Sequence, residues 1–131
     1  MLASKLYYLN KALHGFDCMY DTKMPDIFLV FHGVGTVLGK ATYSDFLTVA
    51  HGVTVGNHRG KYPVLGKGVG LTAHSSIVGD CNIGDRVSVS VYTAIFERNI
   101  PADSVVFNDN SSVKFKASKN PHAQKVYNID L

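Results

Sequence analysis

The sequence contains only two cysteines, Cys18 and Cys81, among its 131 residues, and it has no tryptophan. Two cysteines are too few for a disulfide framework, which favours a reducing compartment. No stretch approaches the roughly 18 uncharged apolar residues that a membrane span requires. The segment MLASKLYYLNKALHG at the N-terminus also lacks the basic start, unbroken apolar run and cleavage site of a signal peptide. We therefore predict a cytoplasmic protein with no membrane span.

The sequence also lacks any block of charge of one sign. The formal net charge is +3, the basic residues are scattered, and none of them belongs to a recognisable nucleic-acid-binding motif. This mild charge tolerates an anionic ligand, but it gives no reason to expect nucleic acid as a partner. A hydrophobic content of 46% with 18% charged residues is that of an ordinary soluble protein, and the length predicts a single domain over residues 1–131.

The first 15 residues carry the pattern of an amphipathic helix. Its apolar stripe has the spacing i, i+4, i+7, i+11 and consists of Leu2, Leu6, Leu9 and Leu13. Gly15 is well placed to end this helix. Residues 16–30 give mixed signals, and Pro25 argues against a continuing helix there.

The most informative feature is a large apolar residue at every sixth position. Six matches neither the 3.6-residue period of a helix nor the two-residue period of a strand. One series consists of Phe31, Val37, Tyr43, Val49 and Val55, and a second of Leu65, Leu71, Ile77, Ile83, Val89 and Ile95. Ten residues separate Val55 from Leu65, so residues 56–64 contain an inserted loop.

A six-residue period predicts a solenoid in which each hexad is a short strand and a turn. Three hexads close a triangular coil of about 18 residues, with the repeated apolar residues inside and parallel strands pairing between coils. Residues 31–100 then make roughly four coils. A right-handed β-helix or a β-sandwich is the alternative. The helix at residues 1–15 and the tail at residues 101–131 are natural covers for the sheet edges at the two ends.

This repeat resembles that of the hexapeptide-repeat acyltransferases, and among them the serine acetyltransferases are most similar. FHGVGTVLG (residues 31–39) is similar to DHATGIVVG of that family, and LTVAHGVTVG (residues 47–56) is similar to VSILQSVTLG. FDCMYDTKMPDIFLVFH (residues 16–32) looks like VDIHPAAKIGRGIMLDH. The resemblance implies a left-handed parallel β-helix, acetyl-CoA-dependent O-acetyl transfer, and a homotrimer with its active sites between adjacent prisms.

The resemblance places His32 on the catalytic histidine of the family and Asp17 on the aspartate that assists it. Acetyl transfer to a hydroxyl needs a base near neutral pKa, and imidazole is such a base. A carboxylate on the other ring nitrogen fixes the tautomer and stabilises the imidazolium. Asp21 and Asp26 lie close to Asp17 in the sequence, so either could replace it, and the alternative for His32 is a surface histidine.

Four further residues are predicted to contact the acceptor. His51 follows His32 by 19 residues, one coil and one position, so it should lie beside His32. There it could bind substrate or polarise the acetyl carbonyl, or it could be a structural turn residue. His58, Lys61 and Tyr62 lie in the inserted loop, which either reaches a neighbouring active site or is a solvated loop. Lys61 and Tyr62 stand where the family has an Arg-His pair that holds the amino-acid substrate. The acceptor is therefore either L-serine or a sugar hydroxyl of a surface polysaccharide.

Four residues are predicted to contact CoA. Ala73 and Ser90 fall on turns of the coils, and the Ala73 turn aligns with a small-residue turn whose backbone approaches CoA in the family. Lys114 and Lys116 could meet the phosphates by charge attraction, or could simply be solvated.

Metal chemistry and a loss of catalysis are the remaining possibilities. Zinc-dependent hexapeptide proteins use a His-x4-His pair, which the histidine spacings here do not provide, so no metal is expected. The competing class is a non-catalytic β-helix that acts as a scaffold or binding module. Its support is the segment 107–118, which departs from the pattern of the family.

Overall fold

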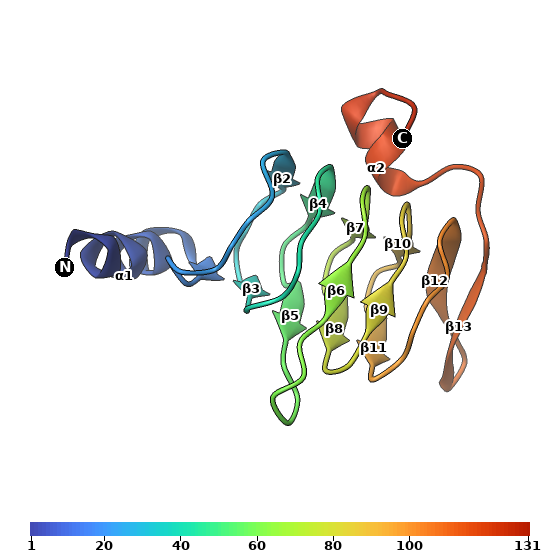
Figure 1. The fold of residues 1–131 in the computed structure, drawn as a ribbon, viewed down its shortest axis with the longest axis horizontal. Coiled ribbons are helices and arrows are strands. Elements are labelled where there is room, and N and C mark those ends of the chain that lie inside the picture. The colour runs from blue at the N-terminus through green and yellow to red at the C-terminus, as the bar shows by residue number, and fades with distance from the viewer.

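The computed structural model describes all residues from 1 to 131, and the fold is mainly β. Short strands wind into a solenoid of about five turns, with helix α1 (Leu2–His14) at one end and helix α2 (His122–Tyr127) beside the coils (Figure 1). The strands are β1 (Asp17–Cys18), β2 (Phe28–Val30), β3 (Val37–Leu38), β4 (Leu47–Val49), β5 (Thr54–Gly56), β6 (Val64–Leu65), β7 (Gly70–Leu71), β8 (Ser76–Val78), β9 (Asn82–Ile83), β10 (Ser88–Val89), β11 (Ala94–Phe96), β12 (Ser104–Asp109) and β13 (Ser112–Ala117).

The strands form three sheets, one for each face of the coil. Sheet A has the strand order β1-β3-β5-β8-β11, sheet B has the order β13-β12-β10-β7-β4-β2, and sheet C consists of β6 and β9. Every pairing is parallel except that of β12 with β13. The predicted mainly β class and the solenoid architecture are confirmed.

The six-residue repeat predicts the interior of the coils correctly from Tyr43 onward. All members of the two series from Tyr43 to Ile95 are buried in one core cluster. The first two members are wrong: Phe31 is only half-buried, and Val37 is 40% exposed while its neighbour Leu38 is 1% exposed.

The cause of this error is a longer first corner. Val30 pairs with Val49, and Val37 pairs with Thr54. The chain therefore takes seven steps from Val30 to Val37 but only five from Val49 to Thr54. From Val30 to Leu38 the chain has two residues more than a hexad, and from Leu38 to Tyr43 it has one fewer, so the inward position is Leu38 and not Val37. The two extra residues also enlarge the turn that carries His32.

The solenoid begins earlier than the repeat indicated. Residues 16–30 supply strands β1 and β2, which pair with β3 and β4 and complete a first turn. The prediction of about four coils was therefore one too few. The irregular corner concealed this turn because it breaks the six-residue spacing.

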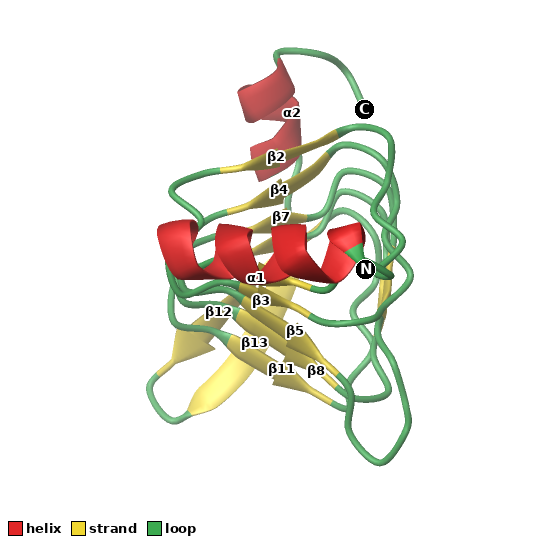
Figure 2. Cartoon of the chain, turned by 90° about the vertical axis from the view of Figure 1, so that its left-hand side faces the viewer, coloured by secondary structure: helices red, strands yellow, loops and turns green.

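Helix α1 forms where predicted, but its leucines do not pack on the coils. Gly15 ends the helix in the left-handed conformation (φ 61°) and donates its N–H to the Lys11 carbonyl. The helix crosses the N-terminal end of the solenoid (Figure 2), yet none of its residues is buried. Its four predicted stripe leucines are 54–71% exposed. The helix is held instead by Tyr7 and Lys11, which both bind Asp17. Neither helix is long and apolar enough to span a membrane.

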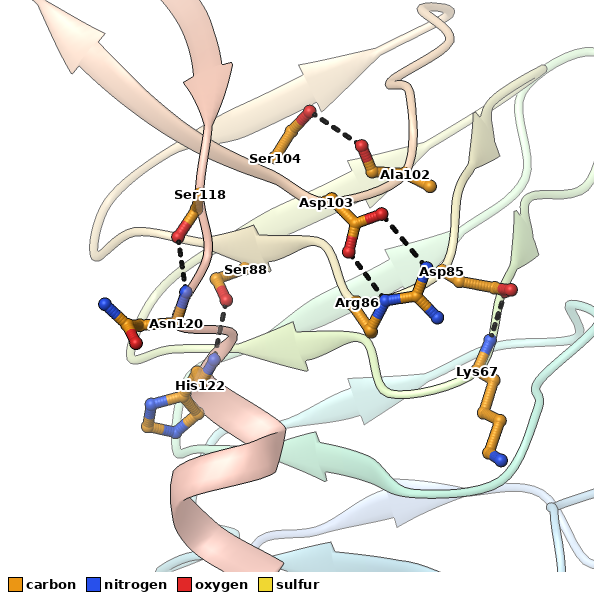
Figure 3. Close-up of polar contacts among 10 residues, drawn as sticks. All are labelled: Lys67, Asp85, Arg86, Ser88, Ala102, Asp103, Ser104, Ser118, Asn120 and His122. Carbon is orange, nitrogen blue, oxygen red and sulfur yellow. Dashed lines mark hydrogen bonds and ion pairs between the residues drawn. The ribbon is translucent and has the colours of Figure 1, made fainter. Parts of the chain in front are cut away.

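The C-terminal residues cover the other end and one face of the coils. Strand β12 extends sheet B, and β13 folds back on it as a hairpin. The chain then returns across the outer face of sheet B, where the His122 N–H donates to Ser88 Oγ (2.8 Å) (Figure 3). Further along, the Tyr127 hydroxyl donates to the Leu47 carbonyl (2.8 Å). At the adjacent corner Arg86 binds Asp103 through Nε (2.6 Å) and a second nitrogen (3.0 Å), which ties two successive turns together (Figure 3).

Candidate active site

Three histidines and a tyrosine form a row along one corner of the solenoid, where each turn passes from sheet B to sheet A. His32 lies between β2 and β3, His51 between β4 and β5, His74 between β7 and β8, and Tyr92 between β10 and β11. The ring centroids of His32 and His51 are 6.2 Å apart, those of His51 and His74 are 5.1 Å apart, and those of His74 and Tyr92 are 4.8 Å apart. We call these four residues the histidine corner. The spacing correctly predicted that His51 lies beside His32.

An open cavity of about 600 Å³ lies at this corner. It is lined by His32, Val34, Gly35, His51, Gly52 and His74. His32 is exposed, as expected for a histidine on an outward turn, whereas His51 is half-buried. The Nδ1 atom of His51 is shut off from solvent and has no hydrogen-bond partner. The cavity therefore presents several imidazole rings to one volume, and an imidazole within reach of a bound hydroxyl can take its proton.

Asp17 does not orient His32 in this structure. One carboxylate oxygen of Asp17 accepts a hydrogen bond from the Tyr7 hydroxyl (2.7 Å), and the other binds the Lys11 ammonium (2.8 Å). These two bonds, led by the one from Lys11, hold the pKa of the Asp17 carboxyl below its ordinary value. Both oxygens are thus committed to helix α1, and no hydrogen bond joins Asp17 to His32. Asp21, one of the two alternatives, binds Lys40 (2.8 Å).

The inserted loop occupies a different corner, where the chain passes from sheet A to sheet C. His58 and Lys61 pair as a short antiparallel bridge across Arg59 and Gly60, which both have positive φ. His58 Nδ1 lies 2.7 Å from Glu97 Oε1, and its ring packs on Phe96 with centroids 4.9 Å apart. The loop is therefore fixed to the solenoid two turns further along the chain, because β8 lies between β5 and β11 in sheet A.

A second cavity of about 480 Å³ adjoins this loop and has only polar lining residues. They are Arg59, Lys61, Asp80, Glu97 and Asn99. Tyr62 of the same loop is 48% exposed. Within one chain, the predicted acceptor residues His58, Lys61 and Tyr62 do not line the cavity at the histidine corner.

The four predicted CoA contacts fall in two places. Ala73 and Ser90 lie at the histidine corner, and the Ala73 carbonyl accepts the N–H of Tyr92 (3.1 Å). Lys114 and Lys116 lie on β13 in the C-terminal hairpin. The Lys114 ammonium already binds Asp109 (2.6 Å), and that of Lys116 lies 5.6 Å from the centre of the Phe107 ring.

Sequence reasoning missed Tyr92 and Glu97. Tyr92 follows His74 by 18 residues, one coil, so the same spacing that placed His51 could have placed it. Glu97 is 39 residues from its partner His58, across the inserted loop, and no local pattern connects the two. No group of three or more His, Cys, Asp or Glu side chains is arranged to hold a metal ion.

The β-solenoid and its six-residue core repeat define a hexapeptide-repeat protein with a histidine-lined corner. No family model matches the chain. Its sequence is 30% identical over 108 residues to a serine acetyltransferase of Helicobacter pylori strain 26695. That alignment covers 79% of this chain and 63% of the Helicobacter protein. It is 27% identical over 110 residues to WcaB of Escherichia coli K12, a protein assigned as a colanic acid biosynthesis acetyltransferase, with 81% and 67% covered.

Solved structures agree with this comparison at the level of the fold. A serine acetyltransferase in complex with cysteine has a TM-score of 0.83 at 16% identity, and covers 99% of this chain and 52% of that chain. One in complex with CoA has a TM-score of 0.75 at 18% identity, with 86% and 48% covered. In sequence and in fold the chain is therefore similar to serine acetyltransferases and to WcaB. The chain spans 43% of the length of a serine acetyltransferase of Synechococcus elongatus and 63% of that of Helicobacter pylori.

Proposed function

We propose that the chain is an acetyl-CoA-dependent O-acetyltransferase whose active site is the histidine corner. The observation that carries this proposal is the convergence of His32, His51 and His74 on one cavity of about 600 Å³. The acetyltransferases to which the chain is similar lend the reaction class. In this proposal His32 is the general base, because it is the exposed imidazole in the enlarged first corner.

The chemistry needs one proton-accepting group and no metal. His32 takes the proton of the acceptor hydroxyl as the oxygen attacks the thioester carbonyl carbon. The imidazolium then returns that proton to the sulfur as the C–S bond breaks. The products are the acetyl ester of the acceptor and free CoA thiol. Asp17 is not part of this scheme, because both of its carboxylate oxygens bind helix α1.

The residues at the corner suit the thioester end of acetyl-CoA better than the lysines suit its phosphates. Gly35 and Gly52 leave the cavity open, and Val34, which is 66% exposed, offers an apolar contact beside them. A relative of the same fold has been solved in complex with CoA. Lys114 would have to exchange Asp109 for a phosphate, so we expect it to contribute less than the sequence suggested.

The acceptor is L-serine or a sugar hydroxyl, and we propose a homotrimer that completes its site. Sheet A lies between the histidine corner and the corner that carries the inserted loop. When a second prism packs alongside, the loop of one chain can therefore meet the histidine corner of the other. In that arrangement the polar cavity at Arg59, Lys61, Asp80, Glu97 and Asn99 would hold the acceptor. Charged groups of both signs suit a zwitterion or a polyhydroxylated ligand.

A non-catalytic scaffold is the second candidate, and one observation favours it. The His74 ring stands at the turn where the resemblance implies small residues, and the Tyr92 ring stacks on it from the next turn. If these rings close the path of CoA, the chain keeps the solenoid without the reaction.

Thiol release from acetyl-CoA, measured with L-serine and with a panel of sugars, separates the two candidates. The variants are His32→Ala and, as a matched control, His14→Ala, which removes an exposed histidine of helix α1. We expect turnover with at least one acceptor, a loss of about 10²–10⁴-fold in His32→Ala, and wild-type rates in His14→Ala. Absence of turnover with every acceptor, together with absence of CoA binding, would leave the scaffold function.

A further inference from the structure

His51 occupies the middle of the histidine corner. Its ring lies edge-on to those of His32 and His74, at interplanar angles of 70° and 89°. His51 lines the cavity, but its Nδ1 atom has no exposed surface and no hydrogen-bond partner. The distal nitrogen Nε2 is therefore the ring nitrogen that is available to the cavity.

The burial of Nδ1 selects the tautomer of the neutral ring. A buried N–H without an acceptor costs about 1–3 kcal/mol, and orphaned donors are rarer in proteins than under-used acceptors. The proton of His51 is thus better placed on Nε2, where a ligand or water can accept it. His51 then presents a single N–H donor to the cavity.

The backbone offers few competing donors at this corner. The N–H of Gly35 donates to the Gly15 carbonyl (2.8 Å), that of Gly52 donates to the Val34 carbonyl (3.0 Å), and that of His74 donates to the His51 carbonyl (3.0 Å). The His74 ring is exposed and stacked on Tyr92. The half-buried His51 is shielded from water more than His74 is, which strengthens a hydrogen bond to developing charge.

We propose that His51 is a second catalytic residue, which stabilises the negative charge on the thioester carbonyl oxygen by donating its Nε2–H. This inference rests on the proposed function. As the acceptor oxygen forms its bond to the carbonyl carbon, the electron pair of the C=O bond moves onto oxygen, and His51 Nε2–H holds it. When the C–S bond breaks, the carbonyl re-forms, the ester leaves, and the proton on His32 passes to the sulfur. Removal of one such donor lowers kcat by about 10²–10³-fold in comparable sites.

Three substitutions at His51 test this role. In His51→Gln the side-chain amide nitrogen can reach the place of Nε2, whereas in His51→Asn the shorter side chain places its amide near Nδ1. We expect His51→Gln to keep kcat within about tenfold, and His51→Asn and His51→Ala to lose about 10²–10³-fold. The KM for acetyl-CoA and the Kd for CoA should stay within about threefold in all three, because the bond forms mainly in the transition state.

The tautomer of His51 can also be measured directly, without any turnover. Long-range ¹H–¹⁵N correlation of the imidazoles in the free protein reports which nitrogen of His51 carries the proton. The Nε2–H form supports the proposal, and the Nδ1–H form overturns it. Equal loss in His51→Gln and His51→Ala, or full activity in all three variants while His32→Ala is inactive, also overturns it. If His32→Ala keeps wild-type turnover, the proposed function itself has failed. If His51→Ala does not fold, the test is the comparison of kcat between His51→Gln and His51→Asn.

Discussion

The rings of His74 and Tyr92 lie face to face, with centroids 4.8 Å apart and planes 10° from parallel. Both residues have a positive φ, of 58° and 53°, and each stands two residues before a strand of sheet A. Gly52 holds the same position one turn earlier, with φ 67°. Residues with a Cβ pay about 1–2 kcal/mol for this conformation. The histidine corner therefore places two aromatic rings on strained backbone, with a glycine next to them.

Gly52→Ala should destabilise the protein more than Gly35→Ala does. Both glycines have a positive φ, so each substitution costs about 1–2 kcal/mol from backbone strain. A Cβ on Gly52 would also overlap Nδ1 of His74, whereas a Cβ on Gly35 meets only the Gly52 Cα at 3.8 Å. Urea unfolding should give a loss of about 2–5 kcal/mol for Gly52→Ala and about 1–2 kcal/mol for Gly35→Ala. Equal losses would mean that the His74 ring is not held against Gly52.

Asp17→Asn should loosen helix α1 without stopping catalysis. The substitution weakens the bonds to Tyr7 and Lys11, so amide exchange in residues 2–14 should accelerate. We expect kcat to stay within about threefold of wild type, against a loss of about 10²–10⁴-fold in His32→Ala. Asp21→Asn, which breaks a comparable ion pair to Lys40, is the matched control and should leave the helix unchanged. A loss in Asp17→Asn as large as that in His32→Ala would restore Asp17 as the residue that orients the base.

His58→Ala should release the inserted loop while leaving global stability almost unchanged. The His58–Glu97 pair is about two-fifths exposed, so it contributes at most about 1 kcal/mol. Hydrogen exchange in residues 57–62 should increase, because the ring contact with Phe96 is lost as well. Lys114→Ala breaks the similarly exposed pair with Asp109 and should not affect these residues. Unchanged exchange in the loop would show that the hairpin holds itself.

The docking of helix α2 should weaken at acid pH because of His122. Burial, and secondarily Lys125, lowers the pKa of His122 in the folded protein below its ordinary value. The unfolded chain therefore binds the proton first as pH falls. The stabilising contribution is complete above the unfolded pKa of about 6.5 and is lost as pH falls from there through the folded value. Limited proteolysis near residues 118–131 should be faster at pH 5.5 than at pH 7.5, and His122→Asn should remove that difference. An equal pH dependence in the variant would assign it to another group.

The hexapeptide period predicted the core of the coils because the narrow prism leaves room for only a few inward side chains in each turn, at fixed positions in the repeat. It failed at Phe31 and Val37, because the stretch from Val30 to Leu38 is two residues longer than a hexad and the stretch from Leu38 to Tyr43 is one residue shorter. It placed His51 beside His32, since one coil is a fixed number of residues. The partners of Asp17 could not be predicted, because the angle of helix α1 is set by Tyr7 and Lys11 and not by the repeat.

A crystal structure of the chain with CoA tests the central claim most directly. The account predicts that CoA binds with its thiol sulfur in the cavity lined by His32, His51 and His74. A second copy of the chain should lie alongside and bring its loop residues 56–64 to the same cavity. CoA bound away from the histidine corner, or no CoA bound at saturating concentration, would contradict the account.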